Sequence, residues 1–404
     1  MTGAGGGRPS AWRRNLIALW FAQFTAIFGF AFAFPFLPLY LHALGVRQPG
    51  ELAFWSGLAG GASGLSLALM SPIWGALADR YGRKSMLVRA MLGGGITVGL
   101  MGFARGPVDL VVLRMLQGAS AGTVAAATAL VATGTPRQRV GWALGVLSSA
   151  VAVGSALGPL VGGLAASAVG VRAIFWAGGL LLGIATLPVL LLVREAPRAA
   201  LAGGGRGSRL AVLKAAAPGA IGAVATLIAC QALVQTSYVG FQPLVVLRLL
   251  ERVGSGTTSV TGLTFAISGL ASATAAVSYA RLARRFGYHR VAAGCAVLLA
   301  TAEAIAGFAP GVIAIVAGAG LAGAFYGAIG PAVSAMVGLE TPAEIQGTVF
   351  GFSSSATAIG FGLGPLGAGL FASQMGASRG IAACACVAVL LASVLGLRTR
   401  EPSR

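Results

Sequence analysis

The stretch GSALGPLVGG at residues 154–163 has a counterpart, GFGLGPLGAG, at residues 360–369, which is 206 positions later in a chain of 404 residues. Two further stretches repeat at nearly the same separation. TPRQ at 135–138 matches TPAE at 341–344, and GALADRYG at 75–82 matches ARLARRFG at 280–287. Three matches in register predict two equivalent halves, an arrangement typical of proteins that carry a ligand site at the bilayer midplane between repeats.

Outside these stretches the composition indicates a membrane protein. The chain is 57% hydrophobic and 9% charged, with a mean hydropathy of +0.87, whereas a soluble domain has about a quarter charged residues. Apolar runs of about 20 residues can each span a bilayer as a helix. We expect twelve such helices, near residues 15–44, 52–78, 86–104, 108–133, 140–164, 171–193, 215–242, 258–283, 291–309, 311–337, 346–371 and 378–397. The fold class is therefore all-α, with two pseudo-symmetric six-helix bundles.

The distribution of positive charge predicts the topology. If both termini lie on one side, that side holds 21 of the 28 lysines and arginines and the other side holds six, with Arg114 inside a helix. An excess of this kind marks the cytoplasmic side. We expect a multi-pass protein of the bacterial inner membrane with cytoplasmic termini. Its parts are an N-terminal bundle (1–193), a basic cytoplasmic linker (194–214) and a C-terminal bundle (215–404).

The same charges do not indicate nucleic acid as a partner, although the formal net charge is +19. The basic residues form short clusters between apolar runs. The four cysteines (Cys230, Cys295, Cys384 and Cys386) lie in apolar segments without metal-ligand spacing. Neither histidine is placed to activate a serine, since His42 and His289 belong to opposite membrane faces. We expect no enzyme activity, no cofactor and no metal.

The repeated TPRQ and TPAE sequences predict helix starts. Threonine can serve as N-cap, proline suits the first helical position, and glutamine or glutamate three residues after threonine can complete a capping box. Helices 5 and 11 should therefore begin at Pro136 and Pro342.

Several stretches, in the correct order, resemble motifs of the major facilitator superfamily, and the resemblance covers nearly the whole chain. The loop after helix 2 resembles its motif A (Gly75, Asp79, Arg80, Gly82, Arg83, Lys84). Helix 4 resembles motif B (Arg114, Gln117, Gly118). Helix 5 resembles the antiporter motif, motif C (Gly154, Gly158, Pro159, Gly162, Gly163). Gly29 with Pro35 to Pro38 resembles twelve-helix drug:proton antiporters, and residues 12–15 and 34–40 resemble MdtG-like multidrug exporters.

The resemblance implies a gating role for motif A. Asp79 stands at a cytoplasmic helix end and could approach the positive N-terminus of helix 11, near residues 341–344. Such a clasp would hold the two bundles together on that side. The second half has Arg284 in place of the acid, so we expect a single clasp.

The resemblance also places the cargo cavity on helices 1, 4, 7 and 10. Helix 7 has polar residues on one face by their spacing (Gln231, Gln235, Tyr238, Gln242). Gln23, Phe30 and Phe34 on helix 1 and Tyr326 on helix 10 could complete the wall. Arg114 is a buried cation that needs polar partners or an acid, and a coupling role for it is expected beside a structural one. An aromatic and amide cavity suits a bulky amphipathic compound.

A proton-binding group is harder to find, since most of the nine acids lie in loops or at helix ends. Glu303 in helix 9 is the candidate for coupling, because a carboxyl group in an apolar span can carry a proton. The alternatives are that Glu303 lies in the outer headgroup region, or that His42 titrates instead.

These observations predict a proton-driven exporter of drug-like amphipathic compounds that works by alternating access. Its partners would be a small-molecule substrate, protons and the lipid bilayer, and it would be a monomer. An exporter of a sugar, a lipid or a metabolite is the alternative transporter, and a non-transporting receptor is a more distant one.

Overall fold

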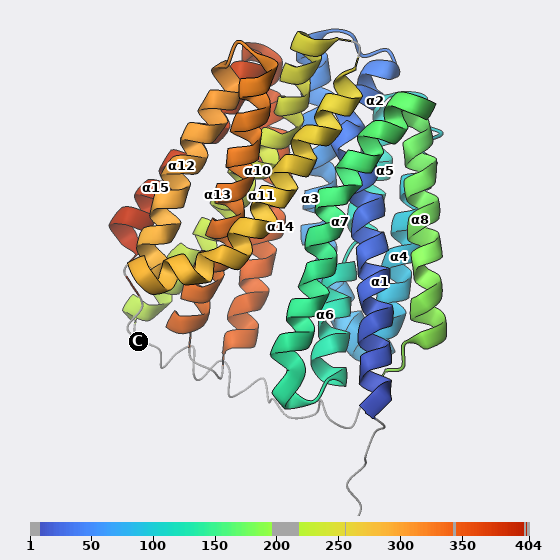
Figure 1. Ribbon diagram of the computed structural model, residues 1–404, viewed down its shortest axis with the longest axis vertical. Helices are drawn as coiled ribbons and strands as arrows, with labels where there is room; N and C mark the ends of the chain where they lie inside the picture. The colour runs from blue at the N-terminus through green and yellow to red at the C-terminus, as the bar shows by residue number, and fades with distance from the viewer. Residues whose placement is uncertain (1–8, 196–217, 255, 342–344, 400, 402–404) are drawn as a thin grey trace, which may run out of the picture.

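The computed structural model describes residues 9–195, 218–254, 256–341, 345–399 and 401, and every element within them is a helix (Figure 1). The first half consists of α1 (Pro9–Ala33), η1 (Phe34–Phe36), α2 (Leu37–Ala43), α3 (Pro49–Tyr81), α4 (Arg83–Met101), α5 (Pro107–Ser120), α6 (Thr123–Gly134), η2 (Arg137–Arg139), α7 (Val140–Val169) and α8 (Val171–Leu192). The second half consists of α10 (Pro218–Val253), α11 (Thr257–Phe286), α12 (Tyr288–Phe308), α13 (Val312–Glu340), α14 (Gln346–Met375) and α15 (Ala377–Arg398). Most of the predicted linker, residues 196–214, lies outside the described residues.

Eleven of the described helical segments are long and apolar enough to cross a membrane. They include α1 with η1 and α2 as one span, and α5 with α6 as another. The remaining predicted span, the third along the chain, is α4, which has 19 residues and carries Arg83, Lys84 and Arg89 among its first seven residues. These charges lower its hydropathy, but α4 packs with α5 and α8 in the bundle. The twelve-helix fold is thereby confirmed.

Two of the predicted spans are interrupted. The first turns into a 3₁₀ segment at Phe34–Phe36, where Pro35 cannot donate a backbone hydrogen bond. The fourth breaks between α5 and α6 at Gly122, whose φ of 125° favours glycine. The Arg89 guanidinium donates to the Ser120 and Ala121 carbonyls (3.1 and 3.2 Å), so the break is hydrogen-bonded from α4.

The repeat is visible in the turns. Gly82, Gly170, Gly287 and Gly376 each join two helices as a single residue with φ between 87° and 95°. Gly82 corresponds to Gly287, and Gly170 to Gly376, at the same separations of 205 and 206 positions that the sequence motifs have. Both halves therefore change direction at equivalent points by the same backbone conformation.

The two halves meet at one end of the bundle. We call the end where α1 begins and α15 ends the basic end, and the opposite one the far end. A Cβ at Gly57 of α3 would lie 2.7 Å from the Cα of Gly369 in α14, and one at Gly163 of α7 would lie 2.8 Å from the Cα of Gly262 in α11. These are symmetry-equivalent contacts between halves, and glycine allows such close backbone approach.

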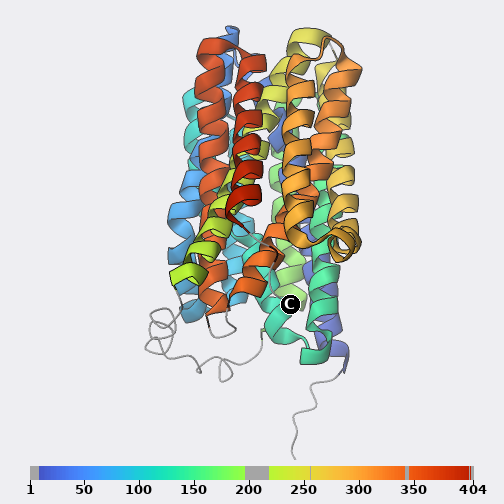
Figure 2. The same cartoon turned by 90° about the vertical axis from the view of Figure 1, so that its left-hand side faces the viewer.

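The contacts place the closure in the far half of the molecule. Residues 50–64 of α3 lie against 361–373 of α14, and residues 155–163 of α7 lie against 258–269 of α11. Figure 1 shows the halves converging there and diverging toward the basic end. In Figure 2 the helices of the second half run roughly parallel to the long axis of the molecule. The structure is thus closed at the far end.

The predicted helix starts at Pro136 and Pro342 are wrong where they can be examined. Thr135 is the C-cap residue of α6, residues 137–139 form η2, and α7 begins at Val140 without a side-chain cap. In the second half, Thr341 ends α13 and its hydroxyl donates to the Val337 carbonyl. The motif therefore marks the turn between two helices, because threonine here bonds backward into the preceding helix. Residues 342–344 lie outside the described residues.

Candidate functional site

The polar face of α10 points into the second bundle. Gln231 donates to the Ser334 hydroxyl of α13 (2.8 Å), and Gln235 accepts from the Tyr326 hydroxyl of α13 (3.2 Å). Two helical turns of α10 are therefore tied to α13 by side-chain hydrogen bonds. The spacing of the glutamines placed them on one face, and the structure brings that face against the predicted partner helix.

Two tyrosines form the aromatic part of this wall. The rings of Tyr238 and Tyr326 stack with centroids 4.0 Å apart at 11°. The Tyr238 hydroxyl shares a hydrogen bond with the Ser268 hydroxyl of α11 (2.9 Å), and Ser268 also donates to the Ala319 carbonyl (3.0 Å). The stacked pair is therefore held at both hydroxyl groups, by Ser268 of α11 at Tyr238 and by Gln235 of α10 at Tyr326.

On the first half, Arg114 is buried at 3% exposure and is held by α3 and α5. Its guanidinium donates to the Ala59 carbonyl (3.3 Å), the Ser63 hydroxyl (2.8 Å) and the Gln117 side chain. Gly118 permits this approach, because a Cβ there would lie 2.7 Å from the Cα of Ser63. Within the described residues no acid pairs with Arg114, so its hydrogen-bond partners are all neutral oxygen atoms.

Aromatic rings of α1 and η1 cover the same cation. The Arg114 guanidinium carbon lies 4.4 Å from the Phe34 ring centroid and 5.8 Å from that of Phe30, and the two rings stack on each other. These are cation–π distances. Gln23, the third predicted wall residue of α1, is 2% exposed, and its amide has no hydrogen-bond partner among the described residues.

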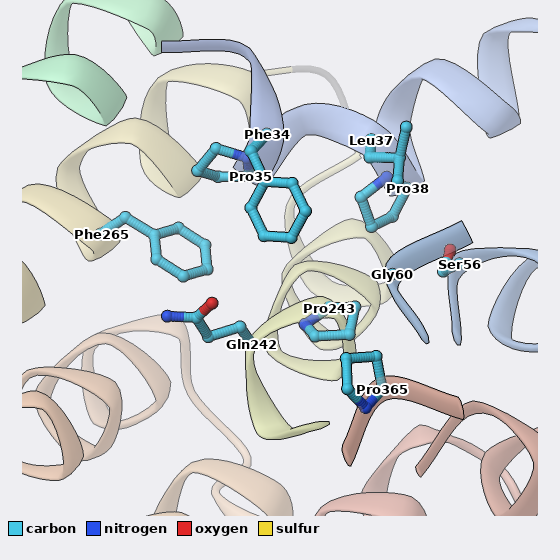
Figure 3. A pocket seen from close by; sticks show the side chains of 10 residues that line it. All are labelled: Phe34, Pro35, Leu37, Pro38, Ser56, Gly60, Gln242, Pro243, Phe265 and Pro365. Carbon is cyan, nitrogen blue, oxygen red and sulfur yellow. The ribbon is translucent and has the colours of Figure 1, made fainter. Parts of the chain in front are cut away.

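A small pocket lies where the two halves meet, on the far-end side of the aromatic and amide residues of α10. Figure 3 shows the rings of Phe34 and Phe265 pointing toward one another with the Gln242 amide close by, and Pro35, Pro243 and Pro365 around them. Its volume is about 20 Å³, which holds roughly one water molecule. The molecule is therefore closed between the polar face of α10 and the far end.

Glu303 of α12 is fully buried, with 0% exposure. The Ser237 hydroxyl of α10 lies 2.9 Å from both carboxyl oxygens and 3.0 Å from the Cys384 carbonyl oxygen of α15. In the part of the chain that the structure describes, Glu303 has no lysine or arginine partner. Helices α10, α12 and α15 enclose the side chain, and Glu303 lies five residues before the far end of α12 at Phe308.

Motif A forms the turn between α3 and α4. Gly82 makes the turn, Arg83 donates to the Ala129 carbonyl (3.0 Å) and Thr133 hydroxyl of α6, and Lys84 donates to the Leu190 carbonyl of α8 (2.9 Å). These bonds gather three helices of the first half. Gly75 has open space around it, Arg80 lies over the Tyr81 ring, and the Asp79 side chain is outside the described set, as is its predicted partner near 342–344.

Sequence reasoning missed the acid that completes this turn. Glu195, just after α8, accepts hydrogen bonds from the backbone N–H groups of Arg83 (2.7 Å) and Lys84 (3.1 Å). Glu401 does the same for Tyr288 (2.8 Å) and His289 (2.9 Å) of α12. A carboxylate at a helix N-terminus is stabilised by the unpaired N–H groups and the helix dipole. The separation of 206 residues between the two acids was the available signal.

The glycines of motif C serve two interfaces. Gly154 and Gly158 face α1, where a Cβ at Gly158 would lie 2.8 Å from the Cβ of Ala31, and Gly162 packs on Phe32 and Phe36. Gly163 instead faces α11 of the other half. Pro159 lies within α7, and its carbonyl oxygen is 2.6 Å from the position of a Cβ on Gly262. One helix thus joins its own bundle and the opposite one.

The sequence matches the Major Facilitator Superfamily over residues 19–251 and 227–404. Curated relatives named multidrug resistance protein MdtG include that of Rahnella sp. (strain Y9602), 34% identical over 89% of this chain and 87% of the relative. The protein of Escherichia coli O17:K52:H18 is 32% identical over 89% and 88%.

Solved structures share the fold. A bacterial homolog of the human lysosomal transporter Spinster, in an inward-facing and unoccupied conformation, superposes with a TM-score of 0.79 at 18% identity over 98% of both chains. The nucleoside transporter NupG superposes with a TM-score of 0.74 at 14% identity over 94% of this chain and 98% of its own.

Proposed function

Since this chain belongs to the Major Facilitator Superfamily and is a secondary transporter of that family, we propose that it exports drug-like amphipathic compounds in exchange for protons. The cargo class rests on relatives that carry the name multidrug resistance protein at 32–34% identity. The chain itself has no catalytic role in this proposal.

The structure adds one observation in support of this cargo: aromatic and amide side chains of α10 and α13 lie together next to the closed far end. The stacked Tyr238 and Tyr326 would supply aromatic contacts to a ligand bound between the halves, and Gln231, Gln235 and Gln242 would supply amide groups. A bulky ligand with an apolar body and few polar groups matches this wall better than a sugar, which needs many hydrogen-bonding partners.

The orientation follows from charge. The basic end holds most of the lysines and arginines, so we place it and both termini in the cytoplasm. The bilayer is the bacterial inner membrane, as the relatives suggest. In that orientation the structure faces inward, ready to take cargo from the cytoplasm or inner leaflet. The two units that rock are 1–193 and 215–404, the linker lies at 194–214, and a monomer suffices.

We place gating in motif A and motif C. Closure of the basic end would bring Asp79 toward the start of α14, and opening of the far end would separate Gly163 from Gly262 and Gly57 from Gly369. Because the glycine contacts at the far end are backbone against backbone, that end would close or open as a unit.

Glu303 is the residue to which we assign the proton. A serine hydroxyl has one hydrogen. If Ser237 donates it to the Cys384 carbonyl, Glu303 can bond to Ser237 only by donating its own proton. The protonated acid therefore lets both Ser237 and the Cys384 carbonyl oxygen receive a hydrogen without any cation, and buried carboxylates lacking a cation are costly. Ser237 precedes Tyr238, so a shift of α10 upon cargo binding would disturb the bond to Glu303.

The test uses membrane vesicles of inverted orientation with an acidic interior. Wild-type protein should give a substrate-dependent alkaline shift of the interior and accumulate amphipathic dyes. Glu303→Gln keeps the shape and hydrogen bonds of the protonated acid, so it should still bind dye and exchange it down a gradient, but lose uphill accumulation. Glu251→Gln is the matched control, since Glu251 pairs with Arg248 at the far end of α10.

Two results would contradict the proposals separately. If no compound in a panel of amphipathic dyes moves faster in wild-type vesicles than in vesicles without the protein, the cargo class is wrong. If Glu303→Gln accumulates dye uphill as the wild type does, transport stands and Glu303 is not the proton carrier.

A further inference from the structure

Two adjoining grooves flank α1 at the basic end, away from the polar wall of α10. The first, between α1 and α7, has a volume of about 540 Å³ and is lined by Trp12, Arg13, Leu16, Ile17, Arg139 and Trp142. The second, between α1 and α8, has a volume of about 550 Å³ and is lined by Arg13, Arg14, Ile17, Phe21, Pro188 and Leu192 among others. Arg13 and Ile17 belong to both, so the grooves form one surface around α1, called the α1 groove below.

The α1 groove is cationic at its rim nearest the start of α1. Arg13 from α1 and Arg139 from η2 approach the same ring, with guanidinium carbons 5.5 and 5.7 Å from the Trp12 centroid. Trp142 packs edge-on against Trp12 at 6.5 Å. Among the described residues no acid lines the groove, and the guanidinium groups of Arg13, Arg14 and Arg139 make no hydrogen bond or ion pair. Their hydrogen-bond donors are available to an anion.

Farther along α1, toward the far end, the surface is apolar and exposed. Ile17 is 59% exposed, Phe21 is 55% exposed and Trp142 is 62% exposed. Ile17 and Phe21 follow Arg13 by one and two helical turns, about 6 and 12 Å along α1. A ligand that fills the groove therefore needs an anionic head and an apolar tail of at least that length, which is the shape of a phospholipid.

The fold alone does not require these residues. At a separation of 206, Arg139 and Trp142 correspond to Ile345 and Thr348 in the second half, which has the same architecture without either side chain. Arginine and tryptophan often occur at the cytoplasmic interface as orientation signals and anchors. That role needs only their depth in the bilayer, and it does not need two arginines from separate elements to converge on one ring above a groove.

We propose that the α1 groove binds an anionic phospholipid of the surrounding leaflet. Its phosphate lies between Arg13 and Arg139, its glycerol region lies against the two tryptophans, and an acyl chain follows Ile17 and Phe21. Basic pockets between helices at this level of a membrane protein match such headgroups by charge. The bound lipid connects α1 with the start of α7, the helix that carries motif C.

Native mass spectrometry of the detergent-purified full chain tests the site. At equal concentration, dioleoyl phosphatidylglycerol should remain bound where dioleoyl phosphatidylcholine, with the same acyl chains, does not. In Arg13→Gln/Arg139→Gln the affinity for phosphatidylglycerol should fall roughly 30-fold, from about fivefold for each basic residue near the surface. Arg284→Gln/Arg290→Gln removes the same charge from exposed positions of the second half and should leave the affinity unchanged.

Three outcomes would overturn the proposal. One is equal retention of the two lipids by the wild type, which can be measured even if a variant fails to purify. Another is an equal loss in both double variants, which would mean that only net charge matters. The third is full competition by inorganic phosphate at millimolar concentration, which would make the rim an anion site that does not use the apolar part of the groove.

Discussion

Closure of the far end depends on glycine, and Gly57→Ala is the sharpest way to test this. The added Cβ would press on the Pro365 carbonyl oxygen and lie 2.7 Å from the Cα of Gly369, and both of these neighbours are backbone atoms of α14 on the opposite half. Carbon atoms at rest are about 3.5–4.0 Å apart, so α3 and α14 must separate by about 0.8 Å or more. Neither side chain can rotate away, because the contact is with the backbone itself.

The cost falls on one conformation only. Overpacking a close contact costs typically about 1–3 kcal/mol. The contact between Gly57 and Gly369 joins the halves, so an alternating-access cycle breaks it when the far end opens. Gly57→Ala should therefore shift the equilibrium toward the far-open state by about 5- to 150-fold. The fold of each half should remain intact.

The assay is a distance measurement between spin labels at the far end. Labels at Glu51 of α3 and Gln374 of α14, both exposed, can be placed in a Cys386→Ser background, since Cys386 is the exposed one of the four cysteines. The wild type should give mainly the short distance. Gly57→Ala should add a longer distance at the expense of the short one.

Two variants of the same chemistry serve as controls. Gly179→Ala creates a contact as close, 2.6 Å from the Cα of Gly99, but within the first half. It should lower thermal stability without changing the distance distribution. Gly330→Ala meets no atom within 4 Å and should change neither. If Gly57→Ala gives the distribution of Gly179→Ala, the glycine contact does not control closure and the reasoning is refuted.

Two other predictions concern single side chains of the first half. Arg114→Lys keeps the charge, but an ammonium group cannot donate to Ala59, Ser63 and Gln117 from one planar group. Transport should therefore fall at least about tenfold, and the melting temperature should fall by a few degrees. If the melting temperature of Arg114→Lys equals that of the exposed control Arg290→Lys, the hydrogen-bond network is not needed. Asp79→Asn should slow transport while the protein stays in the membrane at normal amount, because the clasp at the basic end is lost; wild-type transport by that variant would remove Asp79 from the gate.

Local pattern was sufficient for the large features of this protein. Hydropathy located the spans, the repeat separation paired α7 with α14, and the spacing of glutamines chose the inward face of α10. These are properties of short segments, since bilayer thickness sets helix length and helical periodicity sets which residues share a face. The single-residue turns also follow from sequence, because their positive φ favours glycine at Gly82 and Gly287.

Features that depend on neighbours in space were decided only by the tertiary structure. The sequence could not show that Ser237 and the Cys384 carbonyl meet Glu303, or that Ala59 and Ser63 hold Arg114, because those contacts depend on how each helix is rotated against the next. The threonine of TPRQ looked like a helix start and instead ends α6. Which end of the molecule is closed also depends on packing between the halves. The same sequence must form both states of the cycle, so no segment of it indicates one state over the other.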